Sequence, residues 1–289
     1  MKLIETKIFT YSLILMILLV NIFDNFFESF TNQLLFFLIP LIWPGIAHGS
    51  LDIEIAQRKE IINSIQDKIF FVSGYLLIIC FFFYLWINYN DLVFTIFIIL
   101  SILHFGISDK FKHDGFTNYL EILIRGTIVV SLPLWFHTEK TIEIFSFFLV
   151  SNSLISNFLI INNFVVFFVL LLIIIWIILN YSSNNQDSSQ ILIEFLLLIF
   201  CFIYFEPLVS FFIYFCCLHS TRHLIIEKKR LSLSYKKIFL KTVPLTFIPT
   251  VILLATFINN DYSIYNYIYF VLVGISSLTI PHIILVIFT

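Results

Sequence analysis

Long apolar segments alternate with short polar loops along the whole chain. A membrane-spanning helix needs about 20 mostly apolar residues, and ten segments approach that length. They cover residues 8–23, 33–56, 68–89, 92–109, 118–136, 162–181, 190–205, 207–226, 239–258 and 265–288. No internal repeat or soluble region interrupts them. The pattern therefore predicts an all-α, polytopic transmembrane helical bundle of about ten spans, forming a single integral membrane domain over residues 1–289.

Two segments need separate interpretation. The first apolar run follows Lys2 and Lys7, as in a signal sequence, but no small-residue cleavage site comes after it. We therefore expect it to stay as the first span. The apolar stretch 142–160 is interrupted by several serine and asparagine residues. We expect this stretch to lie at the membrane interface or to re-enter the membrane.

The loops carry charge in alternation, which bears on the direction of each span. Basic residues precede the first span and lie between the second and third, the fourth and fifth, and the eighth and ninth spans. The other loops carry mainly acidic residues. Cytoplasmic loops are enriched in Lys and Arg. Ten spans place every basic loop on one side, which predicts a multi-pass protein of the cell inner (plasma) membrane with both termini in the cytoplasm.

Composition narrows the class of partner. The chain is 60% hydrophobic and 12% charged, with a net charge of −2. A soluble domain carries about 25% charged residues, so membrane lipid is the expected surrounding. A nucleic-acid partner is not expected without a basic patch. The four cysteines all lie in apolar segments, so we expect no disulfides.

Five of the seven histidines lie inside predicted spans, where ionisable residues are costly and usually functional. His113 and His137 are the exceptions, in loops beside charged residues, where solvation is the expected role. The five are His48, His104, His219, His223 and His282. Their spans are all even-numbered and run in one direction in the ten-span topology. The first four histidines then lie at similar depth, toward the cytoplasmic end.

This arrangement predicts a metal site inside the bilayer. His219 and His223 are four residues apart, so they share one helix face and can reach a single ion. Imidazole suits iron, zinc, copper or nickel. Neutral ligands leave the ion's charge uncompensated, so carboxylates are expected nearby. The candidates are Asp52, Asp109 and Glu206.

Other interpretations of these residues stay open. Each histidine alone could bridge two helices or line a water cavity. Asp52, Asp109 and Arg222 could extend to the headgroups, or Arg222 could pair with an aspartate. Gly45 and Gly49 form a small-xxx-small pair, which is typical of close helix packing. The sequence contains no HExxH motif and no phosphate-binding loop.

Four blocks around these residues resemble the Brp/Blh family of membrane beta-carotene 15,15'-dioxygenases. They are His48-Gly49 with Asp52, His104-Phe105-Gly106 with Asp109, His219-Ser220-Thr221-Arg222-His223, and Pro281-His282. Their order and separation fit the family from about residue 40 to the end. One departure is Ala47, where the family pattern would have proline.

The resemblance implies an enzyme that uses Fe(2+) and O2 to cleave the central double bond of beta-carotene into two molecules of all-trans-retinal. It implies that His48, His104, His219 and His223 are catalytic and ligate the iron. Asp52, Asp109, Arg222 and His282 are expected to support them as neighbours. The product is expected to supply a microbial rhodopsin. Four aromatic residues are expected to line the substrate site because they are close in sequence to the histidine blocks. They are Trp43, Phe105, Tyr214 and Phe215.

Three alternatives remain. A diiron lipid hydroxylase or desaturase generally needs around eight histidines, more than the spans provide. A metal-ion transporter usually shows internal repeats and carboxylates at the midplane, which the sequence lacks. A non-enzymatic partner of a rhodopsin would tolerate loss of the histidines.

Overall fold

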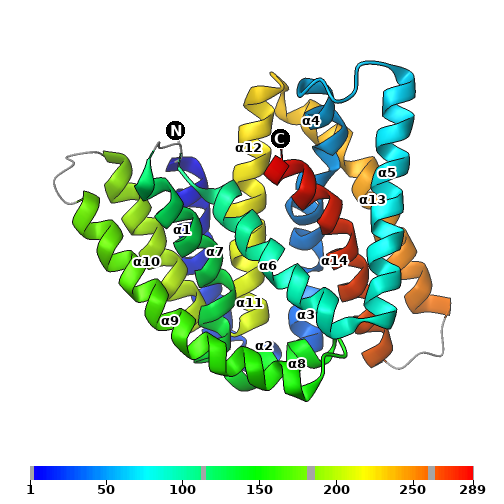
Figure 1. Cartoon of the computed structure of the whole chain (residues 1–289). Coiled ribbons are helices and arrows are strands. Elements are labelled where there is room, and N and C mark those ends of the chain that lie inside the picture. The colour runs from blue at the N-terminus through cyan, green and yellow to red at the C-terminus, as the bar shows by residue number, and fades with distance from the viewer. Residues whose placement is uncertain (1–2, 112–114, 181–185, 260–263, 289) are drawn as a thin grey trace.

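A computed structural model describes residues 3–111, 115–180, 186–259 and 264–288, apart from some side chains, most of them in 245–267. These residues are almost entirely helical (Figure 1), which confirms the predicted all-α fold. Nine helical stretches in the described part are long and apolar enough to cross a membrane. Their outer surface exposes large apolar side chains. The chain is therefore an integral membrane protein.

Most predicted spans are single helices. These are α1 (Leu3–Ile22), α5 (Ile65–Asn88), α6 (Asn90–Asp109), α7 (Phe116–Phe136), α9 (Asn152–Asn180), α10 (Gln186–Tyr204) and α14 (Ile264–Phe288). The expected span 239–258 falls in α13 (Tyr235–Asn259), where many side chains lie outside the described residues. A short helix, α2 (Asp24–Phe27), follows α1.

Two spans are built from several helical pieces. The second comprises α3 (Phe30–Pro40), a kinked turn η1 (Leu41–Gly45) in which Trp43 has a non-helical backbone, a 3-10 helix η2 (Ile46–Leu51) and α4 (Asp52–Arg58). The eighth comprises α11 (Pro207–Phe212), a π-helical stretch η3 (Ile213–Ser220) and α12 (Thr221–Arg230). Irregular backbone at membrane depth is tolerated where it is buried in protein, and π turns occur frequently at functional sites.

The stretch 142–160 differs from the prediction. Its first part ends the short helix α8 (Thr138–Ser146), and its last part begins α9 at Asn152, ten residues before the expected span. Ser151 explains the boundary, because its hydroxyl accepts a 3.2 Å hydrogen bond from the Leu154 N–H as an N-cap does. Asp91 in turn accepts a 2.8 Å hydrogen bond from the Ser151 N–H. The polar residues thus start a long helix, and the stretch is divided between two helices where one segment was expected at the interface or re-entering the membrane.

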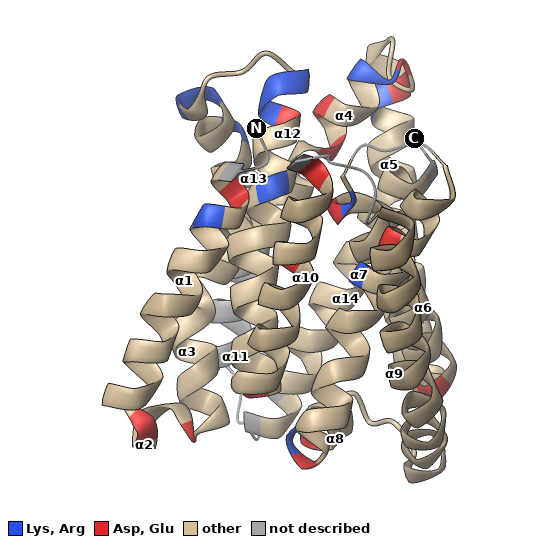
Figure 2. Cartoon of the chain, turned by 90° about the vertical axis from the view of Figure 1, so that its left-hand side faces the viewer, with Lys and Arg blue, Asp and Glu red and all other residues tan. Residues whose placement is uncertain are grey.

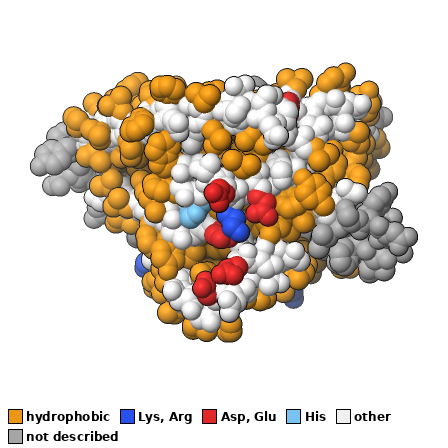
Figure 3. Space-filling view, turned by 90° about the horizontal axis from the view of Figure 1, so that it is seen from below, with side chains coloured by type: hydrophobic (Ala, Val, Ile, Leu, Met, Phe, Trp, Pro, Cys, Tyr) orange, Lys and Arg blue, Asp and Glu red, His pale blue; other side chains and the backbone are white. Residues whose placement is uncertain are grey.

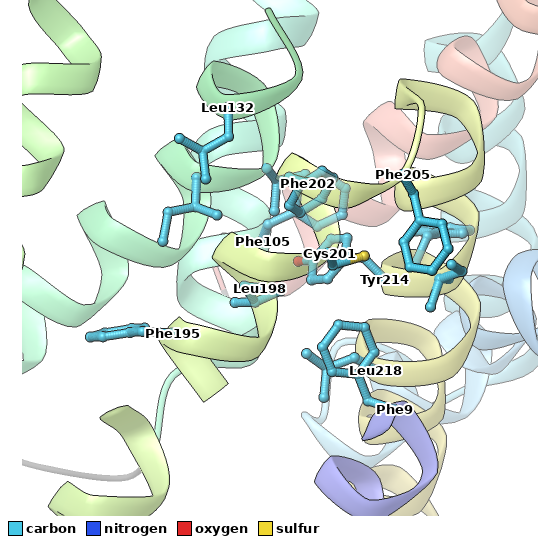
Figure 4. Close-up of a cluster of buried hydrophobic side chains, with 14 of the residues drawn as sticks. Phe9, Phe105, Leu132, Phe195, Leu198, Cys201, Phe202, Phe205, Tyr214 and Leu218 are labelled. Atoms are coloured by element: carbon cyan, nitrogen blue, oxygen red, sulfur yellow. The ribbon is translucent and has the colours of Figure 1, made fainter. Parts of the chain in front are cut away.

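The broken eighth span occupies the middle of the bundle. In Figure 1, α11 and α12 stand between a group containing α1, α7, α9 and α10 and a group containing α5, α13 and α14. Figure 4 shows buried side chains of α1, α10 and η3 converging. Phe9, Phe202, Tyr214 and Leu218 belong to this core, each at most 2% exposed. This packing fixes η3 and so the histidine it carries.

Helices α6 and α7 cross with their backbones in contact. A Cβ atom added at Gly106 would lie 2.2 Å from the Ile122 carbonyl oxygen, and one at Gly126 would lie 1.9 Å from the Ile102 oxygen. Only glycine fits such a close approach. The Gly45 and Gly49 pair proposed for this role has looser surroundings, with the nearest atoms 3.2 Å and 3.7 Å away. The crossing fixes α6 two residues from His104.

Charged side chains mark the two ends of the bundle. Lys and Arg gather at the end that carries α4, α12, the start of α1 and the end of α14 (Figure 2). The opposite end, with α2 and α8, presents a small acidic group around a basic side chain (Figure 3). Glu206 and Lys140 form an ion pair of 4.0 Å there. The surface around this group is mostly apolar.

Candidate metal centre

Five histidines from five structural elements converge inside the bundle. His48 comes from η2, His104 from α6, His219 from η3, His223 from α12 and His282 from α14. All except His223 are at most 4% exposed. Adjacent ring centroids lie 4.8 to 5.4 Å apart around the cluster. The helix ends near them belong to the basic end of the molecule.

Three of these imidazoles already have the spacing of metal ligands. One nitrogen each from His48, His104 and His219 lies within 4.8 Å of the others. The Nε2 atoms of His104 and His219 are 3.2 Å apart. Metal–nitrogen bonds of about 2.0–2.1 Å place neighbouring ligand nitrogens roughly 3.0–3.4 Å apart. The pair therefore needs no rearrangement to share one ion.

The Nδ1 atoms of His219 and His48 each have a hydrogen-bond partner that fixes the orientation of the ring. Asp109 Oδ1 lies 3.2 Å from His219 Nδ1, and the Tyr214 hydroxyl donates a 2.6 Å hydrogen bond to Asp109 Oδ2. The Gly45 carbonyl accepts from His48 Nδ1. A proton on Nδ1 leaves the Nε2 lone pair of each ring free. Ligating histidines generally donate their other N–H in this way.

His282 has a similar carboxylate partner. Its Nδ1 lies 2.8 Å from Asp52 Oδ1, and the Tyr75 hydroxyl donates a 2.8 Å hydrogen bond to Asp52 Oδ2. His282 Nε2 and His223 Nδ1 are buried and have no hydrogen-bond partner among the described residues. Buried polar atoms without partners are rare, and an ion within the cluster would satisfy them. The donor set thus fits a metal that prefers imidazole.

A network of buried ion pairs adjoins the cluster. Arg222 donates a 2.8 Å hydrogen bond to the Asp109 carbonyl and pairs with Glu194 at 2.5 Å. Arg125 lies between Glu194 at 2.8 Å and Glu121 at 2.7 Å. The four buried carboxylates of Asp52, Asp109, Glu121 and Glu194 outnumber the two guanidinium groups of Arg125 and Arg222 by two. The charge of one divalent ion would balance this excess, which buried charge requires.

The three carboxylates expected near the metal lie in different parts of the structure. Asp52 is 3% exposed and Asp109 is 1% exposed, so neither side chain extends to the headgroups. Glu206 lies 4.0 Å from Lys140 of α8, a helix at the opposite end of the bundle (Figure 2), and Gln33 donates a 2.8 Å hydrogen bond to it. Glu206 comes just after α10, which ends at Tyr204, and the chain then returns through α11 and η3 to reach His219. Glu206 is therefore too distant to assist the metal centre, and that expectation was wrong.

The loop histidines stay outside the cluster. The half-buried His137 ring donates a 3.0 Å hydrogen bond from Nε2 to the Ile203 carbonyl, so it has a structural contact besides solvent. His113 lies outside the described residues.

A cavity of about 280 Å³ adjoins the cluster between η2, α5 and α14. Its polar wall includes His48, Asp52 and His282, and most of the remaining wall is apolar. The apolar residues include Leu41, Ile46, Phe71, Val72, Leu76, Ile79, Phe215, Ile275 and Leu278. The cavity therefore offers an apolar ligand direct access to the imidazole groups.

The four aromatic residues expected at a substrate site have different surroundings. Phe215 lies on the cavity wall. Phe105 packs edge-to-face on His219, with centroids 5.0 Å apart, and Tyr214 is bound to Asp109. Trp43 is 40% exposed and contacts Phe239. Phe215 is thus the member of this set that borders both cavity and cluster.

Several residues of the site were not anticipated. Glu121, Arg125 and Glu194 are charged residues within apolar spans, a signal that was available because such residues are usually functional. Glu121 and Arg125 also have the i, i+4 spacing of a helical ion pair. Tyr75 and Ser220 gave no comparable signal. The Ser220 hydroxyl lies 3.2 Å from His48 Nδ1, a contact that depends on where two distant spans meet.

Comparison with known proteins connects this centre to an enzyme family. The family model described as beta-carotene 15,15'-dioxygenase matches residues 39–288, which include all five histidines of the cluster. A beta-carotene 15,15'-dioxygenase from uncultured marine bacterium 66A03 is 29% identical over 270 residues, covering 85% of this chain and 90% of the relative. No solved structure matches the chain. Because the family match covers most of its length, the chain belongs to the beta-carotene 15,15'-dioxygenase family of enzymes.

Proposed function

We propose that the protein cleaves the central double bond of beta-carotene with O2 at one ferrous iron. The proposed iron ligands are His48, His104, His219 and His223. The observation that carries the proposal is the buried group of His48, His104 and His219 at the wall of an apolar cavity. Membership of the dioxygenase family supports the same chemistry.

The reaction balances with O2 as the oxidant. The 15,15' carbon–carbon bond breaks, each of the two carbons becomes an aldehyde carbon, and one O2 is consumed for two retinals. Iron held by imidazoles supplies the activation of O2 for this oxidation. The chain's own residues hold and orient the centre: Asp109 fixes the His219 ring, and the Gly45 carbonyl fixes His48. No side chain needs to act as a general acid or base.

The cavity gives the substrate a place beside the histidines. Beta-carotene is an apolar polyene that dissolves in lipid, so an apolar wall favours its entry and excludes water. A volume of about 280 Å³ is small even for a drug-sized ligand. We infer that the cavity holds the central part of the polyene and that the ends extend along the bundle. Phe215 is the proposed aromatic contact, since it lies next to both His48 and His219.

The proposed topology places the basic end of the bundle in the cytoplasm. Lys and Arg gather at that end, where α1 starts and α14 ends, and the positive-inside rule then sets the orientation. The metal centre lies nearer this side, in the inner (plasma) membrane. The retinal product would leave through the lipid phase toward a microbial rhodopsin.

Expression in bacteria that make beta-carotene tests the function. Active protein should decolourise the cells and yield retinal in extracts. Elemental analysis of the purified protein should give one iron per chain. Well-folded, iron-loaded protein that yields no retinal would reject the reaction. Two irons per chain would instead favour the diiron hydroxylase, and metal uptake into liposomes would favour the transporter.

A further inference from the structure

We propose that His282 is an additional metal ligand and that Asp52 and Tyr75 orient its ring. The inference rests on the metal site of the proposed function. It changes the ligand set, because the last helix, α14, then contributes directly to the centre. His282 was expected to be a neighbour of the ligands, and three observations argue for a larger role.

The first observation is the position of the His282 ring within the cluster. Its centroid lies 4.8 Å from that of His48, 5.2 Å from that of His104 and 5.4 Å from that of His223. His282 thus borders three of the proposed ligands. Its distances match those among the proposed ligands themselves, such as 5.0 Å between His104 and His219.

The second observation is the free nitrogen of the ring. The Asp52 carboxylate can only accept a hydrogen bond when ionised, so the proton of a neutral His282 belongs on Nδ1, which lies 2.8 Å from Asp52 Oδ1. Nε2 then carries a lone pair. That atom is buried and has no hydrogen-bond partner in the described part of the chain. A lone pair left unsatisfied inside a protein is destabilising, and a metal ion would use it.

The third observation is that one hydrogen-bond unit occurs twice. Tyr214, Asp109 and His219 form a chain in which the tyrosine hydroxyl and the histidine Nδ1 bind different oxygens of one carboxylate. Tyr75, Asp52 and His282 repeat it on the other side of the cluster, with both contacts at 2.8 Å. His219 belongs to the group with metal-ligand spacing.

The repeated unit explains why the carboxylates are buried. Each aspartate holds one imidazole in the tautomer that leaves Nε2 free, and each tyrosine donates to the carboxylate oxygen that lies farther from the imidazole Nδ1, which for Asp52 is 3.1 Å away. The two units together also bring two negative charges beside the cluster, which a divalent ion requires. Asp52 and Tyr75 are positioning residues, since they act through His282.

Metal binding by the purified full-length chain tests the proposal. The apo protein in detergent is titrated anaerobically with Fe(2+), and separately with Co(2+), whose absorption bands report its ligands. Replacing His282 by Ala or by Gln should weaken binding of both ions tenfold or more and shift the Co(2+) bands. Asp52→Asn should weaken binding roughly ten- to hundredfold, as loss of an orienting partner does. The matched control is His137→Ala, which alters a histidine outside the cluster.

A chemical rescue separates a ligand from a packing residue. In His282→Gly, added imidazole should restore the Co(2+) bands, whereas 1,2-dimethylimidazole, which is crowded beside its ligating nitrogen, should not. Folded His282→Gln protein with wild-type affinity and unchanged bands would overturn the proposal. So would a failure of imidazole to restore the bands in folded His282→Gly. Wild-type protein that binds neither ion would reject the metal site itself, and with it the proposed function.

Discussion

The Nε2 atoms of His104 and His219 lie 3.2 Å apart, although the residues are separated by 115 positions in the sequence. One atom belongs to the regular helix α6 and the other to the π-helical stretch η3. Their separation suits two ligands of one ion. The centre therefore depends on how accurately the core holds these two elements together.

Loss of a ligand should remove the metal. We expect His104→Ala and His219→Ala each to lower bound iron to less than about a tenth of the wild-type content, and retinal formation at least a hundredfold. The physical reason is that each change deletes a nitrogen of the closest pair. Iron analysis and retinal quantification on matched amounts of folded protein measure both effects. His137→Ala is the control, and full activity of either variant would remove that residue from the ligand set.

Asp109→Asn should weaken metal binding without abolishing it. The amide can donate as well as accept, so it no longer fixes the proton of His219 on Nδ1. Loss of such a partner typically costs 10- to 100-fold in affinity, which a titration with Fe(2+) would detect. Glu139→Gln, at the opposite end of the bundle, serves as the control. Equal affinities in the two variants would show that Asp109 has no orienting effect.

The crossing of α6 and α7 should tolerate no added methyl group. A Cβ atom at Gly126 would lie 1.9 Å from the Ile102 carbonyl oxygen, so Gly126→Ala should destabilise the protein by about 1–3 kcal/mol or more. Gly74→Ala is a matched control, because nothing lies within 4 Å of a Cβ at that position in α5. Unfolding in mixed micelles compares the two. Equal stabilities would contradict the close crossing.

The buried ion-pair network should be far more sensitive than a surface pair. Glu194→Gln leaves Arg125 and Arg222 without their shared carboxylate, and breaking a buried pair costs about 3–5 kcal/mol. The control is Glu54→Gln, which removes a partly exposed pair with Lys241 and should cost at most about 1 kcal/mol. The same unfolding measurement applies. Similar losses in both variants would show that the network is not a structural element.

Narrowing the cavity should reduce catalysis and leave the metal in place. Ile79 lies on the cavity wall, so Ile79→Phe should lower retinal formation tenfold or more because the polyene loses space. Leu77→Phe is the control on the same helix, since Leu77 is 70% exposed on the outer surface. Retinal yield is compared at equal iron content. If Ile79→Phe keeps wild-type yield, the cavity is not the substrate site.

The sequence alone determined the class of the protein and predicted that its histidines lie in one layer. Segment length and hydropathy are local properties, so apolar runs such as 92–109 were sufficient to predict helices such as α6. The placing of His48, His104 and His219 at one depth followed from counting spans. The stretch 142–160 was the exception. Its division depends on Ser151 and its contact with Asp91, 60 residues away.

Tertiary structure decided which groups meet at that depth. The kink at Trp43 in η1, the π-helical stretch η3 and the glycine crossing of α6 and α7 set the angles and rotations of the helices. These angles determine which nitrogens converge. They bring His282 against Asp52 from a distance of 230 positions and leave Glu206 at the far end of the bundle. Such contacts arise from packing between helices, which leaves no periodic pattern in the sequence. The chain thus encoded a histidine layer, and only the packing of its helices turned that layer into a candidate metal centre with defined partners.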